Sequence, residues 1–536
     1  MIARLDAVFG RVTMYRLVAI SLTALAVVAA VFAATGVYVP IGTGAYVGGM
    51  RVLAMLASLA VAVVWASLAN IALAALFRAR FHSESSVITG LLLFFILPPT
   101  LDPIGLLGIA LAAVIASASK WLIAPHGRHL LNPAAFGAFM VGLLGIATGS
   151  GTVASAWWAA SAPLLPFLIV IGLAIAIRTR RGLVMLTFAV VAAISVTVRF
   201  ATSAVPLGDA VNLALVSSPV IFFAVYMITE PLTLPPRRWQ QLLVAAVVGV
   251  LFAVPFSLPG GTVGPFNLGL YATPELWLLV GNVLAFLLAR RRGIRLELVD
   301  RRQLTPTSWE FHFTPAAAVP FAAGQFLELD VPHRRADSRG TRRTFSIASP
   351  PHPEAGIRLG LRVPDERPST YKRALLELPI GAKLSGSSVG GDFTLPGSGE
   401  RPLLLVAGGI GITPFIAQLE HLRHAAEADP QGAAAARDVV LVYAVSSLDE
   451  IAYAAELGRS GARVLLVSPQ PMPRMPQGWE WLGDGRLDGA RLLEAVPDAA
   501  RREVLLSGPP ALIAALRPAL RRAGAKRIRT DAFLGY

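Results

Sequence analysis

The chain has 536 residues, of which 55% are hydrophobic and 15% are charged, whereas a typical soluble domain has about 25% charged residues. This composition excludes a disordered chain and an ordinary cytosolic protein. The formal net charge is +15 and there is no cysteine, which excludes disulfides, thiolate zinc sites, cysteine-ligated iron–sulfur clusters and a catalytic thiol.

The basic excess lies in the N-terminal part of the chain. Up to Gly293 there are 17 Lys/Arg and 6 Asp/Glu, a balance of +11, whereas residues 294–536 hold 30 and 26, a balance of +4. Positive charge within an apolar region is typical of membrane orientation and not of phosphate binding. We therefore expect a transmembrane domain over 1–293, in contact with the lipid bilayer, and no nucleic-acid partner.

Residues 1–293 contain ten apolar stretches, each near the length needed to cross, or with Pro and Gly breaks partly cross, a bilayer core of about 30 Å. They cover 17–39, 52–77, 86–99, 104–119, 133–148, 157–177, 183–198, 210–228, 241–257 and 275–289. The basic, apolar start is also typical of a signal peptide, but nine further segments favour a retained first helix. The sequence predicts a polytopic α-helical membrane domain of about ten transmembrane helices.

Basic groups flank these stretches mainly on one side. If all ten stretches cross, one side receives the groups at Arg4–Arg16, Arg78–Arg80, Lys120–Arg128, Arg178–Arg181, Arg237–Arg238 and Arg290–Arg292. Only Arg51 and Arg199 fall on the other side. Because cytoplasmic loops carry the excess of Lys and Arg, we expect a multi-pass protein of the cell inner (plasma) membrane with both termini in the cytoplasm.

Three polar patches are unusual for helices that face only lipid. They lie at Ser83–Gly90, His129–Gly137 and Met227–Pro235. Ser, Asn and Thr can cap helices and Pro can start them, so each patch alone is also compatible with a structural role. Ionisable groups at membrane depth usually face a cavity or a cofactor. Glu84, Asn132, Thr229 and Glu230 are therefore candidates for a membrane-domain cofactor or ion site.

The strings Asn132-Pro133-Ala134-Ala135-Phe136 and Thr229-Glu230-Pro231 resemble a known family. The family comprises the related ten-helix membrane proteins of Rnf electron-transport complexes and of sodium-translocating NADH:quinone reductases. The resemblance covers about Phe77 to Arg292 and implies an electron-carrying membrane scaffold.

Members of that family carry FMN on a threonine inside a Ser-Gly-Ala-Thr string at the outer face, and this sequence has no such string. The nearest outer loop offers Thr148 and Thr152 as the corresponding positions. The pair Trp157-Trp158 in the same loop could border a non-covalent flavin, or anchor the chain at the membrane interface.

After Arg292 the hydrophobic period changes to that of strands. Two alternating strands occupy Ile294–Phe313 around a turn at Thr305–Thr307, and further strand signals follow at 324–331, 344–347, 357–363 and 382–386. This pattern predicts a soluble antiparallel β-barrel over 294–400. From Pro402 strands and helices alternate, which predicts an α/β parallel-sheet domain over 401–536, with a ligand at the carboxyl ends of the strands.

The predicted barrel contains Arg342-Arg343-Thr344-Phe345-Ser346, which resembles the Arg-x-Tyr-Ser flavin signature of the ferredoxin–NADP reductase family. A guanidinium suits a pyrophosphate, an aromatic ring stacks on a flavin, and a hydroxyl can hydrogen-bond to the isoalloxazine edge. Arg343, Thr344, Phe345 and Ser346 are therefore FAD-binding candidates, although Phe345 stands where the family more often has Tyr. Ser369 and Thr370 open a following helix, where they could receive the FAD phosphate or serve as a simple N-cap.

The nucleotide signal is a strand that runs into Gly408-Gly409-Ile410-Gly411-Ile412-Thr413-Pro414 and then a helix. Glycines let a backbone approach a pyrophosphate, and the helix N-terminus favours its charge. The order of these elements resembles that of the reductase family, which implies that Thr413 and Pro414 border the nicotinamide.

Two later strings extend this resemblance. Ser507-Gly508-Pro509-Pro510 is similar to the family's Cys-Gly-Pro-Pro loop, with serine in place of cysteine. Phe533, close to the C-terminus, is the candidate for the aromatic residue that covers the flavin, with core packing as the alternative. The candidate catalytic residues are Ser346, Thr413, Ser507 and Phe533, and Gly408, Gly409, Gly411, Gly508 and Pro509 are further cofactor-binding candidates. No metal-ligand cluster is predicted.

Together the two halves predict an FAD-dependent NAD(P)H oxidoreductase. The histidines of the membrane half, His82, His126 and His129, all sit at its cytoplasmic edge, which excludes two stacked bis-histidine haems. We expect cytoplasmic NADH or NADPH to reduce FAD, and electrons to reach quinone or an extracytoplasmic flavoprotein. Because a bilayer core of about 30 Å is too thick for one step, FMN or another flavin is implied in the membrane domain.

Two alternatives stay open. An inner-leaflet NAD(P)H:quinone reductase would need no cofactor in the membrane domain. A redox-linked ion translocator, or a transporter that senses nucleotide, would use Glu84, Lys120 and Glu230 along its ion path. The absence of a clear Arg pair after Ser446-Ser447 and Ser468 favours NADH over NADPH.

Overall fold

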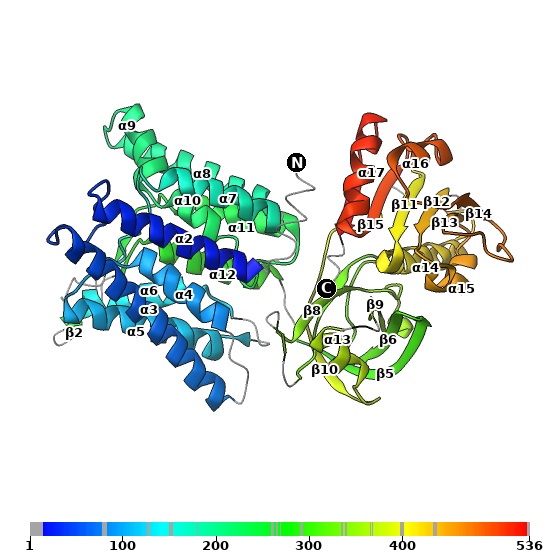
Figure 1. Cartoon of the computed structure of the whole chain (residues 1–536), viewed down its shortest axis with the longest axis horizontal. Helices are drawn as coiled ribbons and strands as arrows, with labels where there is room; N and C mark the ends of the chain where they lie inside the picture. The colour runs from blue at the N-terminus through cyan, green and yellow to red at the C-terminus, as the bar shows by residue number, and fades with distance from the viewer. Residues whose placement is uncertain are drawn as a thin grey trace. The chain divides into compact units, whose positions relative to one another are not determined.

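The computed structural model describes two compact units, Met1–Arg291 and Arg292–Tyr536, and each is treated by itself (Figure 1). The described residues are 14–77, 83–125, 129–148, 154–179, 181–258, 262–263, 266–267, 270–289, 293–333, 336–337, 340–364, 366, 368–396, 401–432 and 437–532. Two candidate site residues, Thr152 and Phe533, lie outside the described residues.

The N-terminal unit is a bundle of helices. Its elements are α2 (Met14–Ala34), α3 (Gly49–Leu76), α4 (Ser83–Ile96), α5 (Pro103–Leu122), α6 (Pro133–Thr148), α7 (Leu165–Thr179), α8 (Gly182–Thr202), α9 (Leu207–Asn212), η2 (Leu213–Ser217), α10 (Val220–Phe222), η3 (Phe223–Met227), α11 (Arg238–Leu251), β1 (Ser257–Leu258), β2 (Thr262–Val263), β3 (Phe266–Asn267), β4 (Leu270–Tyr271) and α12 (Pro274–Ala289). Each predicted apolar stretch contains helix, and the segments η2 and η3 are π-helical.

The prediction of about ten membrane-crossing helices is not supported. Among the described residues four helices, α2, α3, α5 and α8, are long and apolar enough to cross, or five if the pair Leu207–Ser217 and Val220–Met227, bent by 43°, counts as one span. The other apolar helices have 14 to 16 residues, and at about 1.5 Å per residue they are shorter than a bilayer core of about 30 Å. Breaks such as Leu97-Pro98-Pro99 after α4 limit their length.

Glycines allow several of these helices to pack with their backbones close together. A Cβ atom on Gly137 of α6 would lie within 3.0 Å of Ala112 O of α5, and one on Gly90 of α4 would lie 2.6 Å from Val63 Cα of α3. Such small-residue contacts are typical of helix pairs in membranes. The resulting core includes Phe94, Phe95 and Trp158.

Trp157 and Trp158 both point into this core. They are 5% and 0% exposed, and the ring of Trp158 lies 4.9 Å from the rings of Phe94 and Phe95. The indole of Trp157 donates to Glu275 Oε2 at 3.0 Å. Burial on this scale does not agree with an interfacial anchor, which keeps one edge of the ring in the headgroup region.

The first half of the C-terminal unit is a six-stranded antiparallel sheet. Its elements are β5 (Ile294–Thr305), β6 (Ser308–Pro315), β7 (Phe326–Asp330), β8 (Arg342–Ser346), η4 (Pro353–Ala355), β9 (Ile357–Arg362), α13 (Thr370–Leu376) and β10 (Lys383–Gly390). The strand order is β8-β7-β10-β5-β6-β9, and a bridge between Ile347 and Leu359 joins the two ends. The sheet therefore closes into a small barrel around one apolar core, as the sequence predicts.

The second half is a six-stranded sheet in which all paired strands are parallel. Its elements are β11 (Leu403–Gly408), η5 (Gly409–Ile412), α14 (Thr413–Ala428), β12 (Val439–Ala444), η6 (Leu448–Glu450), α15 (Ala454–Gly458), β13 (Arg463–Val467), β14 (Trp479–Gly483), α16 (Gly489–Ala495), β15 (Glu503–Gly508), α17 (Pro510–Arg522) and β16 (Ile528–Ala532). The order β14-β13-β12-β11-β15-β16 puts the fully buried strand β11 in the middle. Apolar side chains of α14 and α15 pack on one face of the sheet, and those of α16 and α17 on the other.

Candidate functional site

The carboxyl ends of β11 and β15 meet in a contact made by glycines. The two strands are parallel neighbours. A Cβ atom on Gly411 would lie 2.7 Å from Gly508 Cα and 2.7 Å from Ser507 O, and one on Gly508, which has φ +141°, would lie 3.0 Å from Gly408 N. The two backbone loops therefore touch without side chains between them. The 16-residue helix α14 begins directly after the first loop, and a helix N-terminus favours the charge of a phosphate group.

Two hydroxyl residues at this edge differ in their hydrogen bonding. Thr413 is fully buried, and its Oγ1 donates to Ile410 O at 2.6 Å, so it fixes the glycine turn. Ser507 is also fully buried, but its Oγ has no hydrogen-bond partner in the described part of the chain. An unsatisfied buried polar group costs about 1–3 kcal/mol. A polar ligand group at this edge would satisfy it, so Ser507 and the glycine contact fit the nicotinamide nucleotide that the sequence implies.

Strand β8 places the flavin candidates Arg343, Thr344, Phe345 and Ser346 in succession. Arg343 Nη2 lies 2.8 Å from Asp337 Oδ1, and its Cζ lies 5.0 Å from the centroid of the Tyr371 ring. The ring of Phe345 lies 5.8 Å from that same Tyr371 ring. Burial raises the pKa of Tyr371 well above its usual value.

Tyr371 was not a site candidate, yet it organises this group from the first turn of α13. Its hydroxyl donates to Leu329 O at 3.1 Å, so the ring is fixed beneath Arg343 and beside Phe345. The sequence signal was an aromatic residue directly after the capping pair Ser369-Thr370, a position that the signature motif itself does not include.

Ser369 and Thr370 hold the local fold. Ser369 caps α13 by accepting a hydrogen bond from Lys372 N at 3.3 Å. Thr370 Oγ1 accepts one from Asp337 N at 3.1 Å and lies 3.2 Å from His333 Nε2. Because α13 has only seven residues and both hydroxyls are already used, the geometry favours the N-cap alternative for this pair.

The barrel and the parallel sheet touch next to Thr413. A Cβ atom on Gly360 of β9 would lie within 3.0 Å of the Tyr453 hydroxyl and 3.3 Å from Thr413 Cγ2. Tyr453 is buried in a left-handed conformation with φ 61°. Burial, and then the charge of Glu310, raise the pKa of Tyr453 well above its usual value. A neutral phenol therefore separates the two sheets at this point.

Ion pairs fasten the same contact. Arg358 of β9 pairs with Glu420 of α14, and Arg302 of β5 lies 3.0 Å from Glu456 of α15. Burial alone would raise the pKa of Glu456, but the hydrogen bond and charge of Arg302 lower it below its usual value. Ser346 adds a weaker link, with its Oγ 3.5 Å from Asp531 Oδ2 of β16. The candidates Ser346 and Thr413 thus both lie where the two halves of the module meet.

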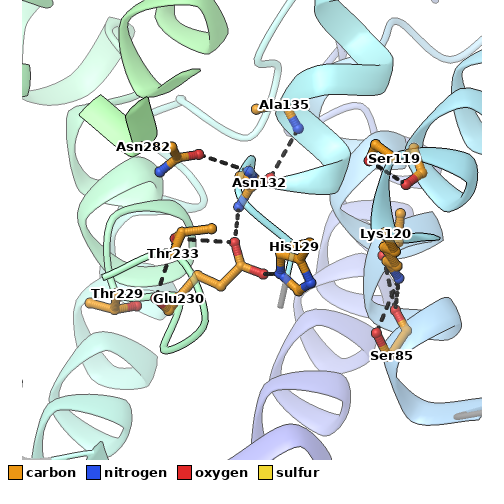
Figure 2. A network of polar contacts seen from close by, with 12 residues as sticks. Ser85, Ser119, Lys120, His129, Asn132, Ala135, Thr229, Glu230, Thr233 and Asn282 are labelled. Carbon is orange, nitrogen blue, oxygen red and sulfur yellow. Dashed lines mark hydrogen bonds and ion pairs between the residues drawn. The ribbon is translucent and has the colours of Figure 1, made fainter. Parts of the chain in front are cut away.

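In the N-terminal unit, Glu230 lies at the centre of a polar cluster that joins three segments distant in sequence (Figure 2). Its Oε1 lies 2.7 Å from His129 Nε2, and its Oε2 accepts from Asn132 Nδ2 at 2.9 Å. Asn132 N donates to Asn282 Oδ1 of α12 at 2.7 Å, and Asn132 Oδ1 accepts from Ala135 N at 3.0 Å. The two strings that carry the resemblance to the ten-helix membrane family are therefore in direct contact.

Lys120 forms a second polar group beside this cluster, as Figure 2 shows. Its Nζ donates to Ser85 O and Ser85 Oγ at 3.0 Å each, and to Thr89 Oγ1 at 2.7 Å. Lys120, His129, Asn132 and Glu230 line one cavity of about 70 Å³. With at least 10–15 Å³ needed for each water, this space admits several waters or a small polar group.

The other membrane-domain candidates differ in position. Thr229 lines this cavity, but its Oγ1 donates to Val225 O at 2.7 Å. Glu84 does not line it, and its Oε2 is buried without a hydrogen-bond partner among the described residues. Thr148 Oγ1 donates to Leu144 O at 2.9 Å within its own helix. Thr148 is therefore not brought together with the Glu230 cluster.

Asn282 is the residue of this cluster that sequence reasoning missed. It is 4% exposed, and its side chain accepts the hydrogen bond from Asn132 N. The available signal was a single amide within the apolar segment Leu276–Ala289, because polar side chains in such segments usually have a partner.

The comparisons with known proteins concern the reductase half most directly. Residues 405–517 match the family model of the oxidoreductase NAD-binding domain. The chain is 30% identical over 238 residues to the beta subunit of a heme-dependent oxidative N-demethylase of Ectopseudomonas mendocina (strain ymp), with 43% of this chain and 66% of that protein covered. It is 28% identical over 215 residues to NADH oxidoreductase HCR of Escherichia coli (strain K12), with 40% and 60% covered. The chain thus spans less than two thirds of these relatives' length.

Among solved structures, the chain is similar to the flavohem-like FAD/NAD-binding domain of nitric oxide dioxygenase from Vibrio cholerae O1 biovar El Tor. That match has 20% identity and a TM-score of 0.37, and it covers 45% of this chain and 99% of that one. The matched residues 405–517 contain the glycine contact, Thr413 and Ser507 described above. The C-terminal unit therefore contains an oxidoreductase NAD-binding domain and fits an FAD- and NAD(P)H-dependent oxidoreductase.

Proposed function

We propose that the protein is a membrane-bound NAD(P)H-dependent flavin oxidoreductase. It takes electrons from cytoplasmic NAD(P)H through FAD in the C-terminal unit, and passes them through the N-terminal unit to an acceptor in the membrane or at its outer face. One observation carries this proposal. A single chain contains both an oxidoreductase NAD-binding domain and at least four helices long and apolar enough to cross a membrane.

We place the protein in the inner membrane with both termini in the cytoplasm. The cavity around Glu230 supports this orientation, because it is lined from the beginnings of α2, α4 and α6 and from the ends of α5 and α7. These helix ends adjoin the basic groups that the sequence assigns to the cytoplasmic side. The polar cluster then lies at the cytoplasmic end of the helix bundle.

The residues of the C-terminal unit would bind and align the two nucleotides. Bound FAD supplies the chemistry, since it accepts two electrons from NAD(P)H and can release them to a further acceptor. Gly408, Gly411 and Gly508 let the backbone approach a pyrophosphate, while Thr413 fixes the turn and Ser507 offers an unused hydroxyl. The grouped side chains of Arg343, Phe345 and Tyr371 would hold the flavin.

The finer form of the proposal adds a second flavin in the N-terminal unit, in keeping with the resemblance to the membrane proteins of the Rnf and sodium-translocating reductase complexes. The contact between Asn132 and Glu230 supports that resemblance. Flavin content decides this point. Full-length protein purified in detergent, assayed for free and covalent flavin and then reduced with NADH without oxygen, should contain two flavins per chain. A content of one flavin per chain would refute the relay across the membrane.

The size of the cavity favours a second candidate function, an inner-leaflet NAD(P)H:quinone reductase. At about 70 Å³ it is smaller than the roughly 300–1,000 Å³ of pockets for drug-sized ligands. Lys120 and His129 line the cavity together with the apolar side chains of Val18, Ile88 and Leu92, so both a polar and an apolar wall face a quinone headgroup. A quinone headgroup needs fewer rearrangements there than a complete flavin.

A pair of acid-to-amide variants tests the role of this cavity. Glu230→Gln keeps the shape of the side chain but removes the charge beside His129, whereas Glu84→Gln makes the same change outside the cavity. We expect NADH oxidation with decylubiquinone to fall at least tenfold only in Glu230→Gln. NADH oxidation with ferricyanide, which can take electrons from the reductase module directly, should be equal in both variants. Equal quinone activity in the two variants would remove the cavity from the electron path.

A further inference from the structure

An apolar groove of about 320 Å³ lies between α2 and α3, at the opposite end of these helices from the Glu230 cluster. Ala26, Ala30 and Ala34 follow one another at intervals of one helical turn along α2, and Met55 and Leu59 of α3 face the same space. Apart from Thr23, every residue that lines the groove is apolar. A flexible hydrocarbon chain suits such a surface, because no polar group of a ligand would find a partner there.

A guanidinium stands at the end of this groove. Arg51 directly precedes Val52, which lines the groove, and its Nη1 donates to Ala33 O of α2 at 3.3 Å. Its Nη2 donates to Tyr46 O at 3.0 Å, while its Nε is buried without a hydrogen-bond partner in the described part of the chain. Within those residues Arg51 forms no ion pair. Its charge is therefore not compensated by any carboxylate of the residues that the structure describes.

The loop between α2 and α3 has a surface suited to lipid. Val37, Val39, Ile41 and Val47 are 45–81% exposed. Exposed apolar side chains grouped on a short segment are typical of contact with a membrane interface. Arg51 would then lie at the depth of the lipid headgroups, with the groove extending from it toward the bilayer interior.

We propose that the α2–α3 groove and Arg51 form a binding site for an anionic phospholipid. One acyl chain occupies the groove, and the phosphate lies against the guanidinium, whose planar set of N–H groups matches phosphate oxygens. The proposal rests on the membrane location proposed above, but not on the path of the electrons. It also gives a reason for a basic residue on the side of the bundle that otherwise has little positive charge.

Native mass spectrometry of the full-length protein in detergent tests this site. The protein is mixed with dioleoyl phosphatidylglycerol or with dioleoyl phosphatidylcholine, and the bound fraction is measured at increasing lipid concentration. Since a cation near the membrane surface contributes attraction to anionic lipid equivalent to about a fivefold change in binding, Arg51→Gln should weaken phosphatidylglycerol binding by about that factor and remove the preference over phosphatidylcholine.

Matched variants separate the two parts of the site. Arg199→Gln removes the other basic residue on that side, and its lipid binding should equal that of the wild type. Ala30→Phe fills the groove and should reduce binding of both lipids, whereas Ala24→Phe adds the same ring at an exposed position of α2 outside the groove and should not. If Ala30→Phe does not fold, Ala30→Leu replaces it.

Three results would overturn the proposal. The first is an unchanged lipid preference in Arg51→Gln, and the second is equal lipid binding in the Ala30 and Ala24 variants. The third is a spectrum that shows a dimer of the chain without bound lipid. NADH oxidation with ferricyanide is measured on each sample. Loss of the ferricyanide activity would show that the reductase module is damaged. If this activity is retained but lipid binding fails, only the lipid site is rejected.

Discussion

Gly411 and Gly508 lie in backbone contact at the carboxyl edge of the parallel sheet, where a Cβ atom on Gly411 would be 2.7 Å from Gly508 Cα. One glycine belongs to the turn after β11 and the other ends β15. Because both neighbours are backbone atoms, neither can move aside as a flexible side chain would. This contact sets the distance between the two loops that we assign to the nucleotide.

Gly411→Ala should therefore weaken NADH binding. Overpacking of this kind costs roughly 1–3 kcal/mol, and relief requires the β11 and β15 loops to separate. We expect the KM for NADH to rise at least fivefold while FAD content stays constant. Gly458→Ala is the control, because nothing lies within 4 Å of a Cβ atom there. Unchanged NADH kinetics in Gly411→Ala would show that the loop spacing does not matter.

The contact between Gly360 and Tyr453 predicts that a second substitution restores the rate of FAD reduction lost in a first one. Gly360→Ala brings a methyl group against the Tyr453 hydroxyl, at less than 3.0 Å, and close to Thr413. We expect it to lower the rate at which NADH reduces FAD, measured by stopped flow, because the barrel and the parallel sheet are pushed apart. Tyr453→Phe removes the clashing oxygen, so the double variant should recover most of the rate. A double variant no better than Gly360→Ala alone would contradict the contact as described.

Removal of the unpaired Ser507 hydroxyl should affect the stability of the protein and its binding of NADH in different ways. In Ser507→Ala a buried polar atom without a partner is removed, so the Tm of the nucleotide-free protein should stay equal or rise. If this hydroxyl serves the nicotinamide, the same variant should bind NADH about fivefold or more weakly, since a hydrogen bond contributes about 0.5–1.5 kcal/mol. A drop in Tm with unchanged NADH affinity would assign Ser507 a purely structural role.

Much of the reductase module could be predicted from its sequence because the decisive signals there are local. The buried strand β11, the glycines and the helix start of α14 follow one another within the 26 residues of Leu403–Ala428. The turn at Thr305–Thr307 likewise fixed the register of β5 and β6, which pair Thr305 with Ser308. By contrast, the short edge strands β14 and β16 lack a long apolar run and were missed.

The contacts that build the sites could not be predicted in the same way, because they join residues distant in sequence. Glu230 and His129 are 101 residues apart, and Tyr453 reaches Gly360 across the contact between barrel and sheet. Their residue types fit several ordinary roles, so only the fold selects one. Hydropathy located the helices of the N-terminal unit, but it did not decide how many of them cross a membrane, because five apolar helices have only 14 to 16 residues.

Acid should loosen the link between the barrel and the parallel sheet. The pKa of Glu456 is lowered in the fold, mainly through the hydrogen bond from Arg302 acting against burial. A lowered carboxyl pKa stabilises the fold above the unfolded value of about 4.3, and this contribution is lost as the pH falls through the folded value. Since Arg302 is half exposed, the pair contributes no more than about 0.2–1 kcal/mol. In Glu456→Gln, the Tm at pH 7 should fall slightly and the Tm difference from wild type should shrink below pH 4.

The last prediction concerns the packing that supports the Glu230 cluster. Asn132 precedes α6, and Gly137 of that helix lies so close to α5 that a Cβ atom would be within 3.0 Å of Ala112 O and 2.8 Å from Ala116 Cβ. Gly137→Ala should force α6 away from α5 and lower the Tm of the full-length protein in detergent. Gly142→Ala, in the same helix, meets nothing within 4 Å.

Because alanine favours a helix over glycine by roughly 0.5–1 kcal/mol, Gly142→Ala should leave the Tm equal or raise it slightly. The displacement of α6 in Gly137→Ala should also move Asn132 away from Glu230, so the quinone activity of this variant should fall while its ferricyanide activity stays at the wild-type level. Equal Tm values for the two variants would show that α5 and α6 are not packed through Gly137. A fall in both activities together would place the damage in the reductase module and not in the helix pair.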